Sequence, residues 1–507
     1  MVRDTDSASL SLPARDNRGK VTSWRFDSLR SVGFLGSVMS LVLCMTWGVT
    51  RSEGLQAAEP VESLRVGFDE VDITPEVGAG RPVWIAGYDW GREATGIHDR
   101  LYARCVVLGD GKTKIALVSV DLVGLQYPEV MRIREALPEI DYVLVSSTHN
   151  HEGPDTIGLW GKNPLTRGVD PDYLKKVVET TAVSVREALR KMAPARVRYG
   201  TAEDETLVSD SRFPKVKDGV LRTLQFESPD TGKLLGVLVQ WNCHPEAMGP
   251  KNTLLTADFV GTTVEQLKER YQVPVAYFTG ALGGLMAPPD HLFHDEQGKE
   301  LKEGDFAYSA AYGRAVAELA GKSLAAGKPI ELVPLRISQA SISLPVHNAA
   351  YRAARTVGVL RRKGVGWTGD FRVTDAPPKA GQEVDFAVVT EVACLQLGQL
   401  RLASIPGELY PELVYGKFQE PAEAAADFPE AALEPTVAGL LGDGPWMLFG
   451  LANDEIGYII PKRQWDEKPP YAYGREKSQY GEINSCGPEV APLLMEAFAE
   501  RVKALAP

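Results

Sequence analysis

The stretch Tyr142-Val143-Leu144-Val145-Ser146-Ser147-Thr148-His149-Asn150-His151-Glu152-Gly153 decides the fold class of this chain. Its apolar beginning is typical of a buried strand, and the polar remainder starts where that strand ends. Upstream, residues 115–120 form another short apolar run, and residues 128–137 show the spacing of a helix. This strand–helix–strand order predicts two parallel strands whose carboxyl ends meet at one edge, where α/β proteins place functional groups.

The rest of the chain supports the same class. With 44% hydrophobic and 24% charged residues, the composition is that of a globular protein. Asp170 followed by Pro171 predicts the start of a second helix. Further elements are predicted as strands at 235–241 and 273–278, an antiparallel hairpin at 386–397 and 400–405, and a last helix at 492–505. Residues 288–305, rich in Pro, Asp, Glu and Gly, predict an exposed excursion that could act as a lid. We therefore expect an α/β fold of mixed sheets flanked by helices, with active-site loops at the carboxyl ends of strands and additional antiparallel hairpins in the C-terminal half.

The first 58 residues differ from the rest. A polar stretch with six Lys or Arg precedes the apolar segment 31–49, which resembles a secretory signal with a long, disordered n-region. The alternative is an uncleaved anchor, since about 19 apolar residues are close to the minimum that spans a bilayer. Three glycines within the segment favour cleavage near Ala57 or Ala58. Either way, we expect residues 59–507 to be secreted or periplasmic.

Charge and cysteine usage exclude some classes of protein. Residues 59–507 hold 48 Lys and Arg against 62 Asp and Glu, a net charge of −14, so nucleic acid is excluded as a partner. Their four cysteines are widely spaced and form no CxxC pair, which favours small core residues over a disulfide framework or a cysteine metal site. These residues are Cys105, Cys243, Cys394 and Cys486.

Histidine is scarce, with seven in 507 residues, yet His149, His151 and His244 all follow apolar runs, as does Glu408. Zinc sites use three or four imidazole, carboxylate or phenolate ligands at about 2.0–2.2 Å. A His-x-His turn leaving a strand allows both rings to face one ion, or one ring to bind while the other contacts the substrate. From spacing alone, a metal site and ordinary polar loop histidines remain open.

Five segments then carry a resemblance to a known family. They are Val66-Gly67 with Asp72-Ile73-Thr74-Pro75, Ala86-Gly87-Tyr88, the run 96–104 (Gly-Ile-His-Asp-Arg-Leu-Tyr-Ala-Arg), Ser119-Val120-Asp121-Leu122, and the run 148–154 (Thr-His-Asn-His-Glu-Gly-Pro). In this order they resemble the successive motifs of the neutral/alkaline non-lysosomal ceramidases, from about Val66 to the C-terminal helix. Members of that family are secreted or membrane-attached zinc amidases that cut the N-acyl bond of ceramide. The resemblance implies that residues 59–507 are a catalytic domain without the family's C-terminal immunoglobulin-like domain. It also implies a Zn²⁺-dependent hydrolase that uses metal-activated water on an amide or ester, with a small-molecule or lipid substrate and contact with a membrane surface.

The same resemblance implies roles for individual residues. Four of them would hold zinc: His149, His244, Glu408 and Tyr458. Three others would take part in catalysis: His151 beside the metal-bound water or substrate oxygen, Arg212 holding a polar group of the substrate, and Tyr480 stabilising the oxyanion. Taken without the resemblance, Tyr458 could be a core or rim aromatic, Glu408 a helix cap, and Arg212 part of a surface ion pair with an acid such as Asp210.

The chain departs from the family pattern at two positions. Glu152 stands where the family usually has serine, and Ala287 stands where the family has an active-site serine. Alanine can neither hydrogen-bond through its side chain nor attack a carbonyl. This leaves an alternative function, a metal-containing binding protein that keeps the scaffold without catalysis.

Overall fold

The computed structural model describes residues 63–378 and 386–506, all of which belong to one unit. The expected signal or anchor at residues 1–58 lies outside these ranges. Within them, no helix has the length and apolar character needed to cross a bilayer.

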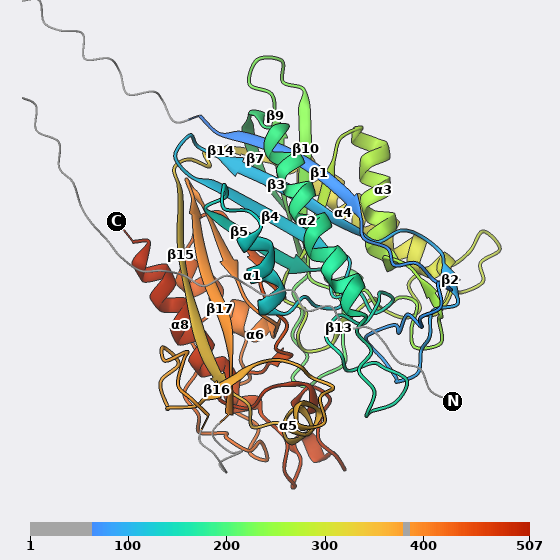
Figure 1. Ribbon diagram of the computed structural model, residues 1–507, viewed down its shortest axis with the longest axis vertical. Coiled ribbons are helices and arrows are strands. Elements are labelled where there is room, and N and C mark those ends of the chain that lie inside the picture. The colour runs from blue at the N-terminus through green and yellow to red at the C-terminus, as the bar shows by residue number, and fades with distance from the viewer. Residues whose placement is uncertain (1–62, 379–385, 507) are drawn as a thin grey trace, which may run out of the picture. The chain divides into compact units, whose positions relative to one another are not determined.

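Three mixed sheets build the described part of the chain (Figure 1). The first has the order β5-β4-β3-β1-β6, with β1 Arg65–Asp72, β3 Tyr102–Gly109, β4 Lys114–Val120, β5 Tyr142–Ser147 and β6 Ala193–Pro194. The second has the order β12-β10-β9-β7-β14, with β7 Arg196–Glu203, β9 Val220–Glu227, β10 Leu234–Trp241, β12 Val275–Thr279 and β14 Lys328–Ile330. The third has the order β15-β17-β18-β20, with β15 Leu335–Pro345, β17 Phe386–Leu397, β18 Leu400–Ser404 and β20 Trp446–Phe449, and β16 Gly364–Gly366 also pairs with β17.

The three sheets share one core, and helices cover their other faces. In β4, Ile115 and Leu117 enter the shared core, while Ala116 and Val118 face the helices, because successive side chains of a strand point to opposite faces. Burial on both faces explains the uninterrupted apolar run in the sequence. The first sheet is covered by α1 Tyr127–Glu135 and α2 Pro171–Arg190, the second by α3 Asp258–Tyr271 and α4 Phe306–Ala326, and the third by α8 Val490–Ala504.

Each sheet contains one pair of parallel strands: β4 with β5, β10 with β12, and β18 with β20. His149 follows β5, His244 follows β10, and Glu408 follows β18 at the start of a short strand, β19 Glu408–Leu409. This strand pairs in parallel with β21 Tyr458–Ile459. The remaining short elements are β2 Gly96–Ile97 with β11 Leu254–Leu255, β8 Ser209–Asp210 with β13 Met286–Ala287, and the helices α5 Ala349–Thr356, α6 Pro411–Tyr415 and α7 Val437–Leu441.

The expected fold class is confirmed. The strand–helix–strand unit is β4-α1-β5, Asp170 caps α2 by accepting from the Asp172 amide at 2.9 Å, and Gly398 turns the β17–β18 hairpin with a φ of 53°. All four cysteines of the described part are buried and free, as expected of core residues.

Candidate metal centre

Four side chains that lie far apart in the sequence meet at the carboxyl ends of these strands. The ligand atoms offered by His149, His244 and Glu408 all lie within 4.8 Å of one another, and the three residues are buried. Glu408 Oε2 is 3.4 Å from His149 Nε2 and 3.0 Å from His244 Nε2. The hydroxyl of Tyr458 lies 3.5 Å from the same nitrogen of His244. The predicted ligand set is therefore brought together in space.

These separations fit a tetrahedral cation. Ligand atoms at about 2.0–2.1 Å from a tetrahedral Zn²⁺ are about 3.3–3.5 Å from one another. The three measured separations, 3.4, 3.0 and 3.5 Å, are close to that edge length. Two imidazoles, a carboxylate and a phenol are also a donor set that suits zinc.

The hydrogen bonds behind the two imidazoles fix the orientation of their rings. His149 Nδ1 lies 2.7 Å from the Val123 carbonyl oxygen, and His244 Nδ1 lies 2.8 Å from the Met286 carbonyl oxygen. A carbonyl only accepts, so each Nδ1 carries the proton and donates it. A ring with its proton on Nδ1 alone directs the Nε2 lone pair at the position between the ligands, as in other metal sites.

Glu408 and Tyr458 are placed by a very short piece of sheet. In the parallel pair β19–β21, Glu408 is the direct partner of Tyr458. The turn after β12 supports this pair, because the Gly283 amide donates to the Leu409 carbonyl at 2.9 Å. A Cβ on Gly283 would lie 2.7 Å from the Glu408 carbonyl oxygen, so only glycine allows this approach.

The centre is electrostatically coupled. Burial opposes the ionisation of Glu408, but the His149 and His244 rings hold its pKa well below the usual range. Burial likewise opposes protonation of His149, yet the carboxylate of Glu408 raises the pKa of that ring to about 9. Without a cation, the His149 ring therefore carries a second proton and a positive charge at neutral pH. A bound cation would replace that charge.

His151 lies next to the cluster and has other neighbours. Its ring centroid is 4.7 Å from that of His149, and its Nδ1 lies 2.9 Å from Glu246 Oε1. Burial lowers the pKa of His151 to about 4, although Glu246 opposes this shift. A Cβ on Gly87 would lie 2.4 Å from the His151 ring, which explains the glycine there. Since the ring is neutral near pH 7, His151 can accept a proton.

A buried ion pair missed by the sequence analysis holds the loop that carries both histidines. Arg92 Nη2 contacts Glu152 Oε2 at 2.6 Å, and both side chains are buried. The other terminal nitrogen of Arg92 donates to the His151 carbonyl at 3.1 Å, and Asn252 Nδ2 donates to Glu152 Oε2 at 2.8 Å. Glu152 thus anchors this loop. No sequence pattern pointed to Arg92 or Asn252.

A cavity of about 570 Å³ opens beside the cluster, and His149, His151, Glu408 and Tyr458 line it. Most of its lining is apolar, with residues such as Val123, Ile157, Leu159, Leu360, Phe386 and Val388. Tyr480 also lines it, at 47% exposure, with its ring 6.0 Å from that of Tyr458. Burial, together with Glu408 and Glu246, raises the pKa of Tyr480 to about 12. Its hydroxyl therefore stays protonated and can donate a hydrogen bond into the cavity.

Glu455 is a second acid in this wall that the sequence analysis did not single out. It is 9% exposed, its Oε1 accepts from the Gly457 amide at 2.7 Å, and its Oε2 has no hydrogen-bond partner. Burial, together with Glu408, raises its pKa well above the usual range. Its position three residues before Tyr458 was the available signal.

Arg212, which the resemblance places at the substrate, is paired with Glu482 in the structure. The side chain is buried, and its terminal nitrogens contact both oxygens of Glu482, at 2.7 and 2.8 Å. They also donate to the backbone carbonyls of Tyr480, at 3.1 Å, and Gln464, at 3.0 Å. Arg212 does not line the cavity, so it supports the backbone of Tyr480 rather than reaching a bound molecule. The alternative, an ion pair with a nearby acid, is confirmed in kind, but the acid is Glu482 rather than Asp210 and the pair is buried rather than at the surface.

The structure also places two other features of the sequence, the excursion at residues 288–305 and Ala287. None of the residues 288–305 lines the cavity, so their role as a lid stays a prediction. Ala287 is in β13, directly after Met286, whose carbonyl accepts from His244.

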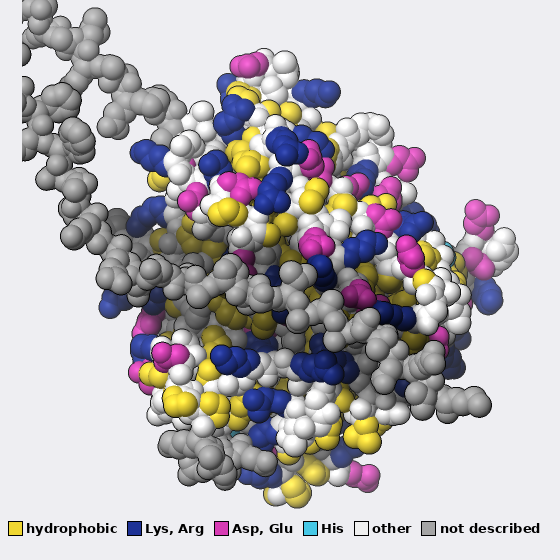
Figure 2. All heavy atoms as spheres, viewed as in Figure 1, with side chains coloured by type: hydrophobic (Ala, Val, Ile, Leu, Met, Phe, Trp, Pro, Cys, Tyr) yellow, Lys and Arg dark blue, Asp and Glu magenta, His cyan; other side chains and the backbone are white. Residues whose placement is uncertain are grey.

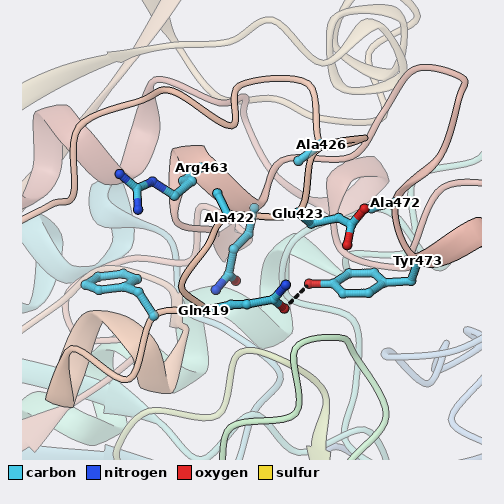
Figure 3. A pocket seen from close by; sticks show the side chains of 9 residues that line it. Gln419, Ala422, Glu423, Ala426, Arg463, Ala472 and Tyr473 are labelled. Carbon is cyan, nitrogen blue, oxygen red and sulfur yellow. Dashed lines mark hydrogen bonds between the residues drawn. The ribbon is translucent and has the colours of Figure 1, made fainter.

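A separate cavity lies between residues 418–426 and 463–473, where Tyr473 donates to Gln419 (Figure 3). At about 10 Å³ it has room for about one water molecule.

The fold and the centre define an α/β protein with a candidate metal site at strand ends. Residues 64–282 match the model of a family described as neutral/alkaline non-lysosomal ceramidase, N-terminal. The resemblance that the motifs carry is thereby confirmed; His149 and His244 fall inside the matched segment, and Glu408 and Tyr458 follow it.

Two solved structures share the fold: neutral ceramidase from Pseudomonas aeruginosa and a ceramidase complexed with C2. Each is 17% identical in sequence to this chain, with a TM-score of 0.64. The match covers 87% of this chain, 74% of the first structure and 75% of the second. At this identity, the two structures establish the likeness of the fold.

Proposed function

We propose that this protein is a zinc-dependent hydrolase that cleaves an amide bond of an N-acyl, lipid-like substrate, or the corresponding ester, outside the cytoplasm. The observation that carries the proposal is the convergence of His149, His244, Glu408 and Tyr458 at the buried side of an apolar cavity, with both Nδ1 atoms held by backbone carbonyls. The match of residues 64–282 to the ceramidase family supports the class of reaction.

Bound zinc would activate water and polarise a carbonyl, so the protein needs no side-chain nucleophile. In this scheme His151 takes up the proton that the attacking water loses and returns it to the leaving nitrogen or oxygen as the acyl bond breaks. Because its Nδ1 faces Glu246 Oε1, the nitrogen that accepts is Nε2. Tyr480 donates a hydrogen bond from its hydroxyl to the carbonyl oxygen as negative charge develops there. Arg212 and Glu482 keep the backbone of Tyr480 in position.

The lining of the cavity supports a substrate with an alkyl chain. Its apolar side chains would bury such a chain, and His149, Glu408 and Tyr458 lie in the same lining. Ala287 removes the hydroxyl that the family provides. The exact acyl and leaving groups are therefore expected to differ from those of ceramide.

The decisive experiment measures metal content and turnover together. The purified chain should hold one equivalent of zinc and hydrolyse a generic long-chain N-acyl amide probe, and a chelator should remove both properties. His244→Ala and Glu408→Ala should lose the zinc while the circular dichroism spectrum stays unchanged. His291→Ala, which alters an exposed histidine paired with Glu300, serves as the matched control.

Three outcomes separate the possibilities. Full zinc in both ligand variants would overturn the ligand assignment. Zinc that is retained by the wild type without turnover on a broad panel of amides and esters would favour the non-catalytic binding protein. Turnover that survives complete removal of metal would refute zinc dependence.

A further inference from the structure

We propose that the rim of the cavity is a docking surface for a lipid bilayer that contains anionic lipids. Four segments form this rim, and we call them the collar: residues 88–91, 159–167, 348–363 and 480–486. All four contribute residues to the cavity lining. The proposal goes beyond hydrolysis, since binding to a bilayer can be measured whether or not the bound lipid is cleaved.

The collar is one connected surface. Three hydrogen bonds join its segments in sequence: Gly91 N to Gly161 O at 2.9 Å, Arg167 Nη1 to Val359 O at 2.6 Å, and Asn348 Nδ2 to Ile483 O at 2.8 Å. Side chains from different segments therefore keep fixed positions around the opening.

Each segment of the collar exposes a large apolar side chain. Trp90 is 56% exposed, Leu165 74%, Val357 54% and Ile483 58%, and the ring of Tyr480 joins them. All of these residues line the cavity as well as facing water. Single exposed apolar residues are ordinary on a protein surface, but a group around one opening marks a site of interaction.

The charge of the collar selects the partner. Residues 350–363, which include most of α5, hold five Lys or Arg and no Asp or Glu, in a chain whose net charge is −12. Arg362 is buried against Asp454, but Arg361 and Lys363 are exposed. In Figure 2, yellow and dark blue side chains lie side by side in the lower part of the view, the region of α5 in Figure 1.

Exposed apolar side chains next to basic residues are typical of a segment that lies at a membrane interface. α5 has no buried residue, and Ala350, Ala353 and Ala354 on it line the cavity. A short helix that combines alanines at the opening with the basic residues Arg352 and Arg355, and that has tryptophan nearby, is suited to the headgroup region of a bilayer. Basic residues near such a surface are attracted to anionic lipids.

The position of the collar explains what docking would achieve. Its apolar side chains surround the opening, so a collar seated on a bilayer would join the apolar cavity directly to the hydrocarbon region. An alkyl chain could then enter the cavity without crossing water, which avoids the cost of exposing it.

The experiment uses the full chain and two kinds of vesicle, phosphatidylcholine alone and phosphatidylcholine mixed with phosphatidylglycerol, both containing brominated lipid. Trp90 fluorescence should be quenched by the mixed vesicles. The quenching is read as the difference between wild type and Trp90→Phe, since the N-terminal segment carries Trp24 and Trp47 of its own.

Val357→Asp should lower binding to the mixed vesicles about tenfold, because an apolar side chain leaves the bilayer. The matched control is Val183→Asp on α2, since Val183 has the same exposure, 54%, and lies outside the collar. Arg361→Glu combined with Lys363→Glu should weaken binding to mixed vesicles and leave binding to neutral vesicles unchanged.

Equal quenching in Trp90→Phe and wild type, or equal loss of binding for Val357→Asp and Val183→Asp, would overturn the proposal. A wild-type chain that elutes as a dimer, and a Val357→Asp chain that elutes as a monomer, would assign the collar to a second copy instead. All of these readouts are independent of hydrolysis, so their failure is separate from a failure of the proposed function.

Discussion

Replacing Arg212 by methionine should destabilise the protein strongly, because the buried carboxylate of Glu482 would lose its charged partner. Both side chains are 1% exposed, and the carboxylate would keep backbone amides as donors, among them that of Asp466 at 3.0 Å, but no positive charge. Removing one partner of a buried ion pair costs about 3–5 kcal/mol. In the double variant Arg212→Met/Glu482→Gln the buried charge is gone. Only the carbonyls of Tyr480 and Gln464 lose a donor, so we expect about 2 kcal/mol to be recovered.

Urea denaturation followed by circular dichroism measures these differences, with the midpoint and the slope reported for each variant. Arg81→Met is the matched control, since Arg81 contacts Asp172 at the same 2.7 Å separation but both side chains are exposed. Its midpoint should not move. If Arg212→Met keeps the wild-type midpoint while its KM rises, Arg212 holds the substrate, as the family resemblance implies, and the positioning role is refuted. If the double variant is no more stable than the single one, the argument from buried charge fails.

Four further outcomes follow from the centre and its supports. The zinc affinity of the metal-free chain should fall about 50-fold between about pH 9 and about pH 7, because the pKa of His149 is about 9 and the fraction of rings free of the second proton falls from about one half to about one in a hundred. Competition with a chromophoric chelator measures this change, and a flat profile would contradict it. Tyr480→Phe should lower kcat about 100-fold with unchanged zinc content, whereas an unchanged kcat would remove the hydroxyl from the reaction. Gly283→Ala should cost about 1–3 kcal/mol and release zinc, while Gly444→Ala, whose Cβ would meet nothing closer than 3.9 Å, should change neither property. Ala287→Ser should raise turnover of long-chain N-acyl amides about tenfold, and an unchanged rate would assign this loop to another substrate.

Local signals were enough to predict much of the fold. The unit β4-α1-β5 follows from two apolar runs on either side of a helical pattern, and its parallel pairing puts His149 at a sheet edge. The cap at Asp170 and the turn at Gly398 were recognisable from their residue types. Each of these features depends on a few consecutive residues, whose physical preferences act within that stretch.

The features that could not be predicted depend on contacts between distant segments. The pairing of Glu408 with Tyr458 uses two strands of two residues each, too short to leave a periodic pattern. The burial of Arg212 depends on Glu482, 270 residues later in the chain. The collar likewise joins four separate segments, and no one of them has a composition that indicates an opening.

The turns that carry His149 and Tyr458 are also joined to one another by hydrogen bonds, and these bonds affect how the centre is formed. His149 has a φ of 66°, which is rare for a residue with a side chain and persists only where the surroundings enforce it. Asn453, in the turn before Tyr458, accepts from the Val145 amide at 2.9 Å and donates its own amide to the Val145 carbonyl at 2.6 Å.

Val145 belongs to β5, the strand that leads to His149, so the first and third sheets hold each other's ligand turns. Neither His149 nor Tyr458 can then move without breaking hydrogen bonds that are buried and costly to lose. The ligand positions are therefore set by the packing of the sheets, and a cation would enter a site that already has its shape.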